Sequence, residues 1–255
     1  MVTQVSNLFL STISPDVRAS LLRAATTVLL PVHTVLYEQA TASRYAYFLL
    51  CGLASVVIGM PNGESAEVAF IGRQGLVGVP YLLGPALSST RCMMQLSGSA
   101  LRVPFSHLQY VFDNSSEVRG RVLDFVQEQA AVVAQIPGCN RLHNAEQRLT
   151  RWLLMAQDRT GYESLDFTQE YLSQMIATRR STATLIAGAL QERGLIRYSR
   201  GRIHILNRPG LETAACACYP IVKGLFDALY QGDKPLRPDI VRGSGPGPLP
   251  LPVSA

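Results

Sequence analysis

The sequence lacks the features that direct proteins into membranes or out of the cell. Its first twelve residues, MVTQVSNLFLST, contain neither a basic segment nor the small-residue cleavage site of a secretory signal. Its nineteen-residue uncharged run, residues 45–63, includes Gly52, Gly59 and the turn signal Pro61-Asn62-Gly63. These residues favour two buried strands and a hairpin over a membrane-spanning helix. We therefore expect a cytoplasmic protein without a membrane partner.

Patterns typical of enzymes and metal sites are also missing. The chain has no Gly-x-Ser-x-Gly elbow and no phosphate-cradling glycine loop, so we expect no enzymatic activity. Its cysteines and histidines are too irregularly spaced to indicate a disulfide framework, a zinc motif or haem ligands, so we predict no metal site and no cofactor. Inert buried thiols and oxidant sensors are alternatives for Cys139, Cys216 and Cys218, and the sequence favours inert thiols. The cysteines of the chain are Cys51, Cys92, Cys139, Cys216 and Cys218, and its histidines are His33, His107, His143 and His204.

Charged residues are scarce, and their excess of positive charge is confined to one region. The chain has 255 residues, of which 47% are hydrophobic and 16% charged, so it can bury the cores of two modest domains. Residues 141–208 carry eleven arginines against six acids, whereas basic and acidic residues balance before and after this window. The whole net charge of +5 therefore lies there. Clustered arginine predicts a polyanion partner, and a solvated basic face is the alternative.

Short apolar segments alternate with turn signals from Thr27 to about Pro104. These segments are rich in valine, leucine, tyrosine and phenylalanine, and they are interrupted by turns such as Gly72-Arg73-Gln74-Gly75. This pattern is typical of an antiparallel β-roll or barrel. Ahead of it, Ser14 is placed to cap a helix predicted over residues 15–25.

Helical spacing begins at about Ser115 and predicts one long amphipathic helix. Such a helix could pack on its own roll or pair with a second copy, and its length beside a compact roll favours dimerisation. Pro137-Gly138 should kink or end the helix and so begin a hinge. The apolar residues on its predicted inner side are Val118, Val122, Phe125, Ala130, Val132 and Val133.

Two short helices joined by a tight turn are predicted further along the chain. Thr168 is placed as the N-cap of a helix over residues 169–176, and a second helix is expected from about Arg179 to Arg193, before Gly194. Residues 195–205 alternate in polarity around Ser199-Arg200-Gly201, which predicts a hairpin. Flanking helices are expected over residues 145–156 and 209–230, and the glycine- and proline-rich tail from residue 231 should be disordered.

This arrangement is typical of a winged helix-turn-helix, whose second helix enters the major groove by its N-terminal end. A helix N-terminus offers free N–H groups to phosphates, and arginine can bind a guanine edge through two hydrogen bonds. Arginines on the hairpin would neutralise backbone phosphates. A helical hairpin with merely solvated arginines is the alternative. The predicted DNA contacts are Arg179, Arg180, Ser181, Thr182, Thr184, Leu185, Arg197, Arg200 and Arg202.

The chain resembles the Crp/Fnr family of bacterial transcription regulators. The resemblance covers about residues 8–218 and rests on the order of elements and on residues 168–182, TQEYLSQMIATRRST. It implies a homodimer that binds a two-fold symmetric operator in double-stranded DNA and touches RNA polymerase. Of the family's Arg-Glu-x-x-x-Arg set, which falls here on Arg180, Ser181 and Leu185, only Arg180 matches. We therefore expect a target that differs from the family's best-known sequence.

The predicted effector site departs from that of family members that bind cyclic AMP. Those members resemble one another in a Gly-Glu pair for the ribose and an Arg-Ser/Thr-Ala run for the phosphate. Here Val79 replaces the acid and Thr90 takes the place of the arginine, while Arg91, one residue on, faces the other side of its strand. The lost charge-assisted hydrogen bond is worth about 1.5–3 kcal/mol, so we expect an unknown small-molecule effector rather than a cyclic nucleotide. The predicted pocket residues are Gly75, Val77, Gly78, Val79, Ser89, Thr90 and Arg91.

Together these patterns predict an α+β protein with four segments. They are a β-roll sensor domain (1–114), a dimerisation helix and hinge (115–143), a winged helix-turn-helix domain (144–230) and a tail (231–255). The function predicted is sequence-specific DNA binding in transcription regulation. The alternative is a ligand-binding β-roll module that regulates a partner protein without DNA, and it leaves the confined arginine charge unexplained.

Overall fold

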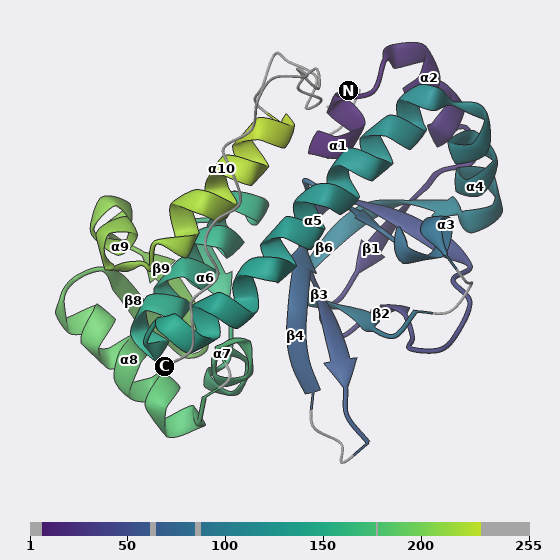
Figure 1. Ribbon diagram of the computed structural model, residues 1–255. Helices are drawn as coiled ribbons and strands as arrows, with labels where there is room; N and C mark the ends of the chain where they lie inside the picture. Colours follow the sequence, from purple (N-terminus) through teal and green to yellow (C-terminus); the bar gives the residue numbers. More distant parts are fainter. Residues whose placement is uncertain (1–6, 62–64, 85–87, 177, 231–255) are drawn as a thin grey trace, which may run out of the picture.

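The computed structural model describes residues 7–61, 65–84, 88–176 and 178–230. The chain is an α+β protein, as predicted, in which the long helix α5 runs from an antiparallel β-roll to a helical part with a small sheet (Figure 1). The predicted disordered tail lies outside the described residues. The elements up to α5 are α1 (Leu8–Ser11), α2 (Pro15–Leu22), β1 (Thr26–Leu30), β2 (Val35–Tyr37), β3 (Tyr45–Gly59), β4 (Ser65–Ile71), β5 (Leu76–Val77), α3 (Pro80–Leu83), β6 (Arg91–Pro104), α4 (Phe105–Asn114) and α5 (Ser116–Leu142).

The sheet of the β-roll is built around the antiparallel pair β3 and β6. Its strand order is β1-β6-β3-β4, with β2 on β6 and β5 on β3. The prediction of two strands within residues 45–63 is wrong, because Tyr45–Gly59 forms one strand of 15 residues, β3. Gly52 has a φ of +87°, and a Cβ on Gly98 would lie 2.1 Å from the carbonyl oxygen of Cys51. These two glycines let the long strands bend and approach closely instead of stopping.

Helix α5 does not end at Pro137, which was one of the two predicted outcomes. It begins after Ser115, whose Oγ accepts a hydrogen bond from the Val118 amide (3.3 Å), and it continues to Leu142. Proline lacks an N–H and leaves a carbonyl one turn earlier without its helical partner. The carbonyl that loses its partner is that of Val133. Because Val133 and Pro137 are exposed, water can bind this carbonyl and the helix can continue.

Ser14 occupies the predicted N-cap position of α2, directly before Pro15, but its side chain does not cap the helix. Its hydroxyl donates a hydrogen bond to Glu117 Oε2 (2.7 Å), and its backbone N–H donates to Oε1 of the same carboxylate (2.6 Å). Helix α2 carries no side-chain N-cap and ends at Leu22 rather than near residue 25. Ser14 therefore ties the N-terminal segment to the first turn of α5 instead of closing its own helix.

The helical part lies at the other end of α5 and carries a three-stranded sheet of order β7-β9-β8. The single helix predicted over residues 209–230 is wrong, because Ala215 is extended and separates two helices. The second of these, α10, runs back along α5 (Figure 1). No helix in the described ranges is long and apolar enough to cross a membrane. The elements are α6 (Ala145–Thr160), β7 (Ser164–Asp166), α7 (Gln169–Met175), α8 (Arg180–Glu192), β8 (Ile196–Ser199), β9 (Arg202–Ile205), α9 (Arg208–Ala214) and α10 (Cys218–Tyr230).

The β-roll and the helical part share a core and a polar contact. Phe70 of β4 packs on Trp152 of α6 with ring centroids 5.6 Å apart, and Trp152 packs on Tyr171 of α7 at the same distance. Beside these rings, Glu67 of β4 accepts hydrogen bonds from Trp152 Nε1 (3.0 Å), from the Tyr171 hydroxyl (2.9 Å) and from Ser55. One carboxylate of the β-roll thus binds both α6 and the first helix of the α7–α8 pair.

The buried Glu67 contact predicts a pH-dependent stability. Burial raises the pKa of Glu67 from its ordinary value of 4.5 to about 7, although its three hydrogen-bond donors favour the ionised form. Between these values the folded state binds a proton that the unfolded state has released. The free energy of unfolding should therefore fall as the pH rises from about 4.5 to above 7, by at most about 3 kcal/mol.

Urea denaturation across this pH range measures the effect. Glu67→Gln should flatten the profile between pH about 4.5 and 7, since the side chain no longer titrates. The exposed Glu163→Gln serves as the matched control and should leave the profile of the natural chain intact. An equally steep profile in Glu67→Gln would assign the pH dependence to other groups.

Candidate nucleic-acid interface

Helices α7 and α8 form the predicted helix-turn-helix. The predicted N-cap Thr168 is confirmed, because its Oγ1 accepts a hydrogen bond from a backbone N–H in the first turn of α7 (3.1 Å). After α7, the Thr178 amide donates to the Ser173 carbonyl (2.9 Å) and closes the turn. Helix α8 then begins at Arg180, one residue later than predicted.

Helix α8 has a small buried face and a larger open one. Ala183, Ala187 and Leu190 pack inward, and Gly194, with a φ of +68°, follows the end of the helix. Leu185 points away from the core and is 75% exposed. The open face contains all the helix residues predicted to contact DNA, and these are exposed or partly exposed: Arg179, Arg180, Ser181, Thr182, Thr184 and Leu185.

The N-terminus of α8 is open to an external anion. Asn144 and Thr168 cap α6 and α7 through their side chains, but Arg179 at the N-cap of α8 makes no such bond. The first turn of α8 also contains no acidic residue. Its free N–H groups and the positive end of its dipole are therefore available to a phosphate. Neither Arg179 nor Arg180 forms an ion pair with a carboxylate of the described residues.

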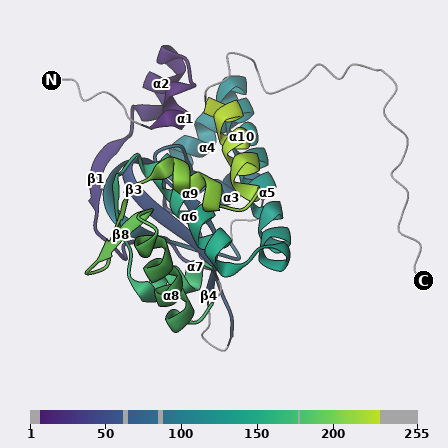
Figure 2. The same cartoon turned by 90° about the vertical axis from the view of Figure 1, so that its left-hand side faces the viewer.

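The predicted wing is the hairpin of β8 and β9, which lies beside α8 (Figure 2). Its turn residues Arg200 and Gly201 have φ values of +51° and +78°, typical of a two-residue hairpin turn. Arg197 and Arg200 are exposed, and neither is ion-paired within the described ranges. Arg202 is also exposed, but its Nε lies 2.6 Å from Asp166 Oδ1. The three wing arginines thus differ, because only Arg202 shares its charge with an acid.

The predicted effector site coincides in part with a cavity of about 340 Å³ between the β-roll and α5. Its walls are almost wholly apolar, and no charged side chain of the described residues lines it. Its Thr90 hydroxyl is already hydrogen-bonded to the Tyr37 hydroxyl (3.1 Å) and to Ser88 Oγ (2.9 Å). Of the predicted pocket residues, Gly78, Val79 and Thr90 line the cavity, whereas Gly75, Val77, Ser89 and Arg91 do not.

Two of the residues outside the cavity have other partners. Arg91 Nε lies 3.1 Å from Glu38 Oε2, on the side of the roll that faces the wing. Gly75 lies against Ile71 of β4 and Phe125 of α5, since a Cβ there would be 2.4 Å from Ile71 Cγ2 and 3.0 Å from the Phe125 ring. The cavity therefore offers hydrophobic contact and no cation for a phosphate.

An apolar seam runs along α5 and includes Ala130 and Val133 of the predicted apolar face. Leu123, Val126, Ala130, Val133 and Pro137 are spaced three and four residues apart along the helix. Leu123 is 41% exposed and Val133 39%, so the seam is open in the single chain. Its heptad spacing, visible in the sequence, is that of a coiled-coil interface. Of the six residues predicted for the inner side, Val118, Val122, Phe125 and Val132 are buried within the chain, which was one of the two predicted roles of the helix.

The helix-turn-helix region matches a known domain family. Residues 147–214 match the model of the Crp-like helix-turn-helix domain. This range contains α7, α8 and the hairpin whose geometry is described above. No curated protein is significantly similar in sequence to the chain.

Solved structures share the fold over about three quarters of the chain. FixK2 from Bradyrhizobium japonicum aligns with a TM-score of 0.66 and 15% identity, over 76% of this chain and 98% of that one. The c-di-GMP-responsive global regulator CLP of Xanthomonas campestris aligns with a TM-score of 0.63 and 12% identity, over 75% and 99%. A CRP/FNR-family transcriptional regulator of Thermus thermophilus, TTHA1359, aligns with a TM-score of 0.61 and 20% identity, over 74% and 98%. At these identities the likeness concerns the fold.

Proposed function

Since the chain is a DNA-binding transcription regulator of the Crp/Fnr family, we propose that it acts as a homodimer on a two-fold symmetric operator. The open N-terminus of α8 carries this proposal. Arg179 and Arg180 stand there without an acidic partner among the described residues, and the exposed wing arginines lie on the adjacent hairpin. We expect this dimer to work in the cytoplasm and to contact RNA polymerase, as the family resemblance implies.

The exposed face of α8 suggests which residues read the operator. The first helical turn would enter the major groove, where Arg180 can bind a guanine edge through two hydrogen bonds. Ser181 and Thr184 are short enough to let the helix approach the bases, and the exposed Leu185 can contact a thymine methyl group. Arg179 and the wing arginines would bind phosphates and so position the helix.

The apolar seam of α5 supports the dimer. Two copies of the seam can pair in parallel and place two α8 helices on one side of the DNA, with half-sites about 34 Å apart. Analytical ultracentrifugation of the full chain at micromolar concentration tests this part of the proposal directly. A dimer is expected, and a strict monomer at that concentration would contradict it.

Removal of a wing charge should weaken binding to all sequences alike. Arg200→Ala removes an exposed arginine that forms no ion pair with the described residues, so each chain should neutralise about one phosphate fewer. The slope of log affinity against log salt should become shallower by about one for each phosphate no longer neutralised, with little change in base preference. Fluorescence anisotropy with specific and random duplexes at several salt concentrations measures both quantities. Arg202→Ala is the comparison variant, and it should have a smaller effect because Asp166 already shares its charge.

The cavity between the roll and α5 supports an apolar effector. Cyclic AMP carries a phosphate that would lie against hydrophobic walls without a cation, at a cost of several kcal/mol unless it is paired. Saturating cyclic AMP should therefore leave the melting temperature and the DNA affinity unchanged. A rise of the melting temperature with cyclic AMP concentration, measured by calorimetry, would contradict this expectation.

A further inference from the structure

Four potential metal ligands converge where α5 meets the junction of α9 and α10. Cys139 lies in the last turn of α5, and His143 follows four residues later, so both side chains face the same way. Cys216 lies between α9 and α10, and Cys218 is the first residue of α10. The three sulfur atoms and a ring nitrogen of His143 all lie within 4.8 Å of one another.

The spacing of these atoms matches a tetrahedral zinc ion. Such an ion, with bonds of about 2.3 Å to sulfur and about 2.0 Å to nitrogen, holds its sulfur atoms about 3.8 Å apart and sulfur and nitrogen about 3.5 Å apart. The Sγ atoms of Cys139 and Cys216 are 3.6 Å apart. Cys218 Sγ is 3.7 Å from His143 Nδ1. Two of the six ligand pairs therefore already stand at about the separation that the ion requires, and the other pairs lie within 4.8 Å.

The surroundings of the cluster suit a site of negative charge. The three thiols form a buried group separate from the larger apolar cores. Burial raises the pKa of each of them, and the nearby guanidinium of Arg151 acts against this rise. Arg151 is itself buried, and its Nε has no hydrogen-bond partner in the described ranges. Three thiolates, one neutral imidazole and Zn²⁺ carry a net charge of −1, which Arg151 would balance.

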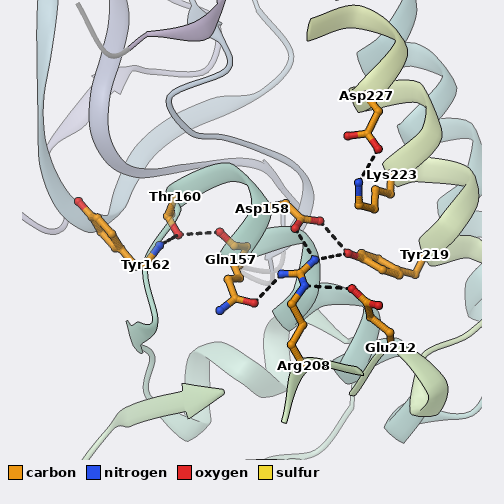
Figure 3. A network of polar contacts seen from close by, with 10 residues as sticks. Gln157, Asp158, Thr160, Tyr162, Arg208, Glu212, Tyr219, Lys223 and Asp227 are labelled. Atoms are coloured by element: carbon orange, nitrogen blue, oxygen red, sulfur yellow. Dashed lines mark hydrogen bonds and ion pairs between the residues drawn. The ribbon is translucent and has the colours of Figure 1, made fainter. Parts of the chain in front are cut away.

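Polar contacts hold the segment that carries Cys216 and Cys218 in place. Arg208 at the start of α9 binds Gln157 and Asp158 of α6 at 2.6 and 2.7 Å (Figure 3). The Tyr219 hydroxyl, next along the chain from Cys218, donates to Asp158 (3.0 Å). The Tyr219 amide also donates to the Cys216 carbonyl (2.9 Å). This bonding fixes the two cysteines opposite the end of α5 before any ion is bound.

We propose that Cys139, His143, Cys216 and Cys218 bind one zinc ion in a closed tetrahedral site. Binding would release three thiol protons and leave no open coordination position, so the site would be structural. It would join the end of the long helix to the chain that follows the wing, and so fix the joint between α5 and the helix-turn-helix. The proposal does not depend on DNA binding. Ligand spacing along the sequence could not predict it, because the two pairs of ligands lie on distant segments.

Metal analysis of the full chain, purified without a histidine tag or chelator, tests the proposal. We expect about one zinc per chain by mass spectrometry of the elements, and retention of the metal after desalting. Cys216→Ser should lower the content at least tenfold, whereas Cys51→Ser, which removes a thiol outside the cluster, should leave it unchanged.

Cobalt binding to the metal-free natural chain keeps the test independent of whether the variant folds. A tetrahedral thiolate site gives Co²⁺ intense visible absorption and thiolate charge-transfer bands, which Cys51→Ser should reproduce. The proposal is overturned if the natural chain retains less than a tenth of an equivalent of zinc after zinc is supplied and gives no such bands. A Cys139–Cys216 disulfide in the purified chain, with no metal uptake after its reduction, would overturn it as well.

Discussion

Replacing Arg180 with alanine should abolish the base preference of the protein at one position of each half-site. Arg180 is the first residue of α8, is exposed, and forms no ion pair with the described carboxylates. A bidentate arginine–guanine contact is worth about 1–3 kcal/mol of discrimination, and a dimer uses it twice. Affinity for the operator should therefore fall by about 2–6 kcal/mol, roughly 30-fold to more than 10,000-fold. Binding to random duplex DNA should change far less, because other arginines still bind phosphates.

Competition binding with the operator and with single-base variants of it measures this effect. Arg193→Ala is the matched control, because Arg193 lies at the far end of the same helix and pairs with Glu146 at 2.5 Å. That variant should keep the base preference of the natural chain. An Arg180→Ala protein with an unaltered preference profile would show that another element reads the sequence.

Replacing Leu123 with glutamate should convert the proposed dimer into a monomer at micromolar concentration. Leu123 lies on the open seam of α5, where the substitution would bury two carboxylates against each other in the dimer. A monomer binds only one half-site, so operator affinity should fall by about a thousandfold or more as the effective concentration of the second half-site is lost.

Sedimentation and operator binding should change together in this variant. Leu29→Glu is the matched control, since Leu29 is 83% exposed on β1, away from the seam. It should remain a dimer and bind the operator normally. A Leu123→Glu protein that stays dimeric would place the interface elsewhere.

The helix-turn-helix could be predicted because its signals are local. The cap at Thr168, the inward spacing of Ala183 and Leu190, and the terminating Gly194 each act within a few residues. The hairpin turn at Arg200-Gly201 is local as well. The sequence could not show that Arg202 is paired with Asp166, because that contact joins two strands.

Two of the incorrect predictions concern contacts between distant residues. Two strands are predicted within residues 45–63, but Gly52 and, on the neighbouring strand, Gly98 let one strand bend and continue to Gly59. Ser14 had an available helix to cap, yet its hydroxyl binds Glu117, which is distant in sequence. Of the residues predicted for the effector pocket, Thr90 lines the cavity, whereas Arg91 turns outward to Glu38, as its position one residue further along the strand predicts. The preference of a residue for helix, strand or turn does not show whether a residue distant in the sequence will bind its side chain.

Selection of randomised duplex DNA by the purified full chain, with no effector added, tests the central claim most directly. We expect enrichment of an inverted repeat whose half-sites lie about one helical turn apart. That result would establish a dimeric, sequence-specific regulator and provide the operator for the other experiments. Failure to enrich any sequence, from a chain that is folded and dimeric and that shows no salt-sensitive binding to DNA, would contradict the account.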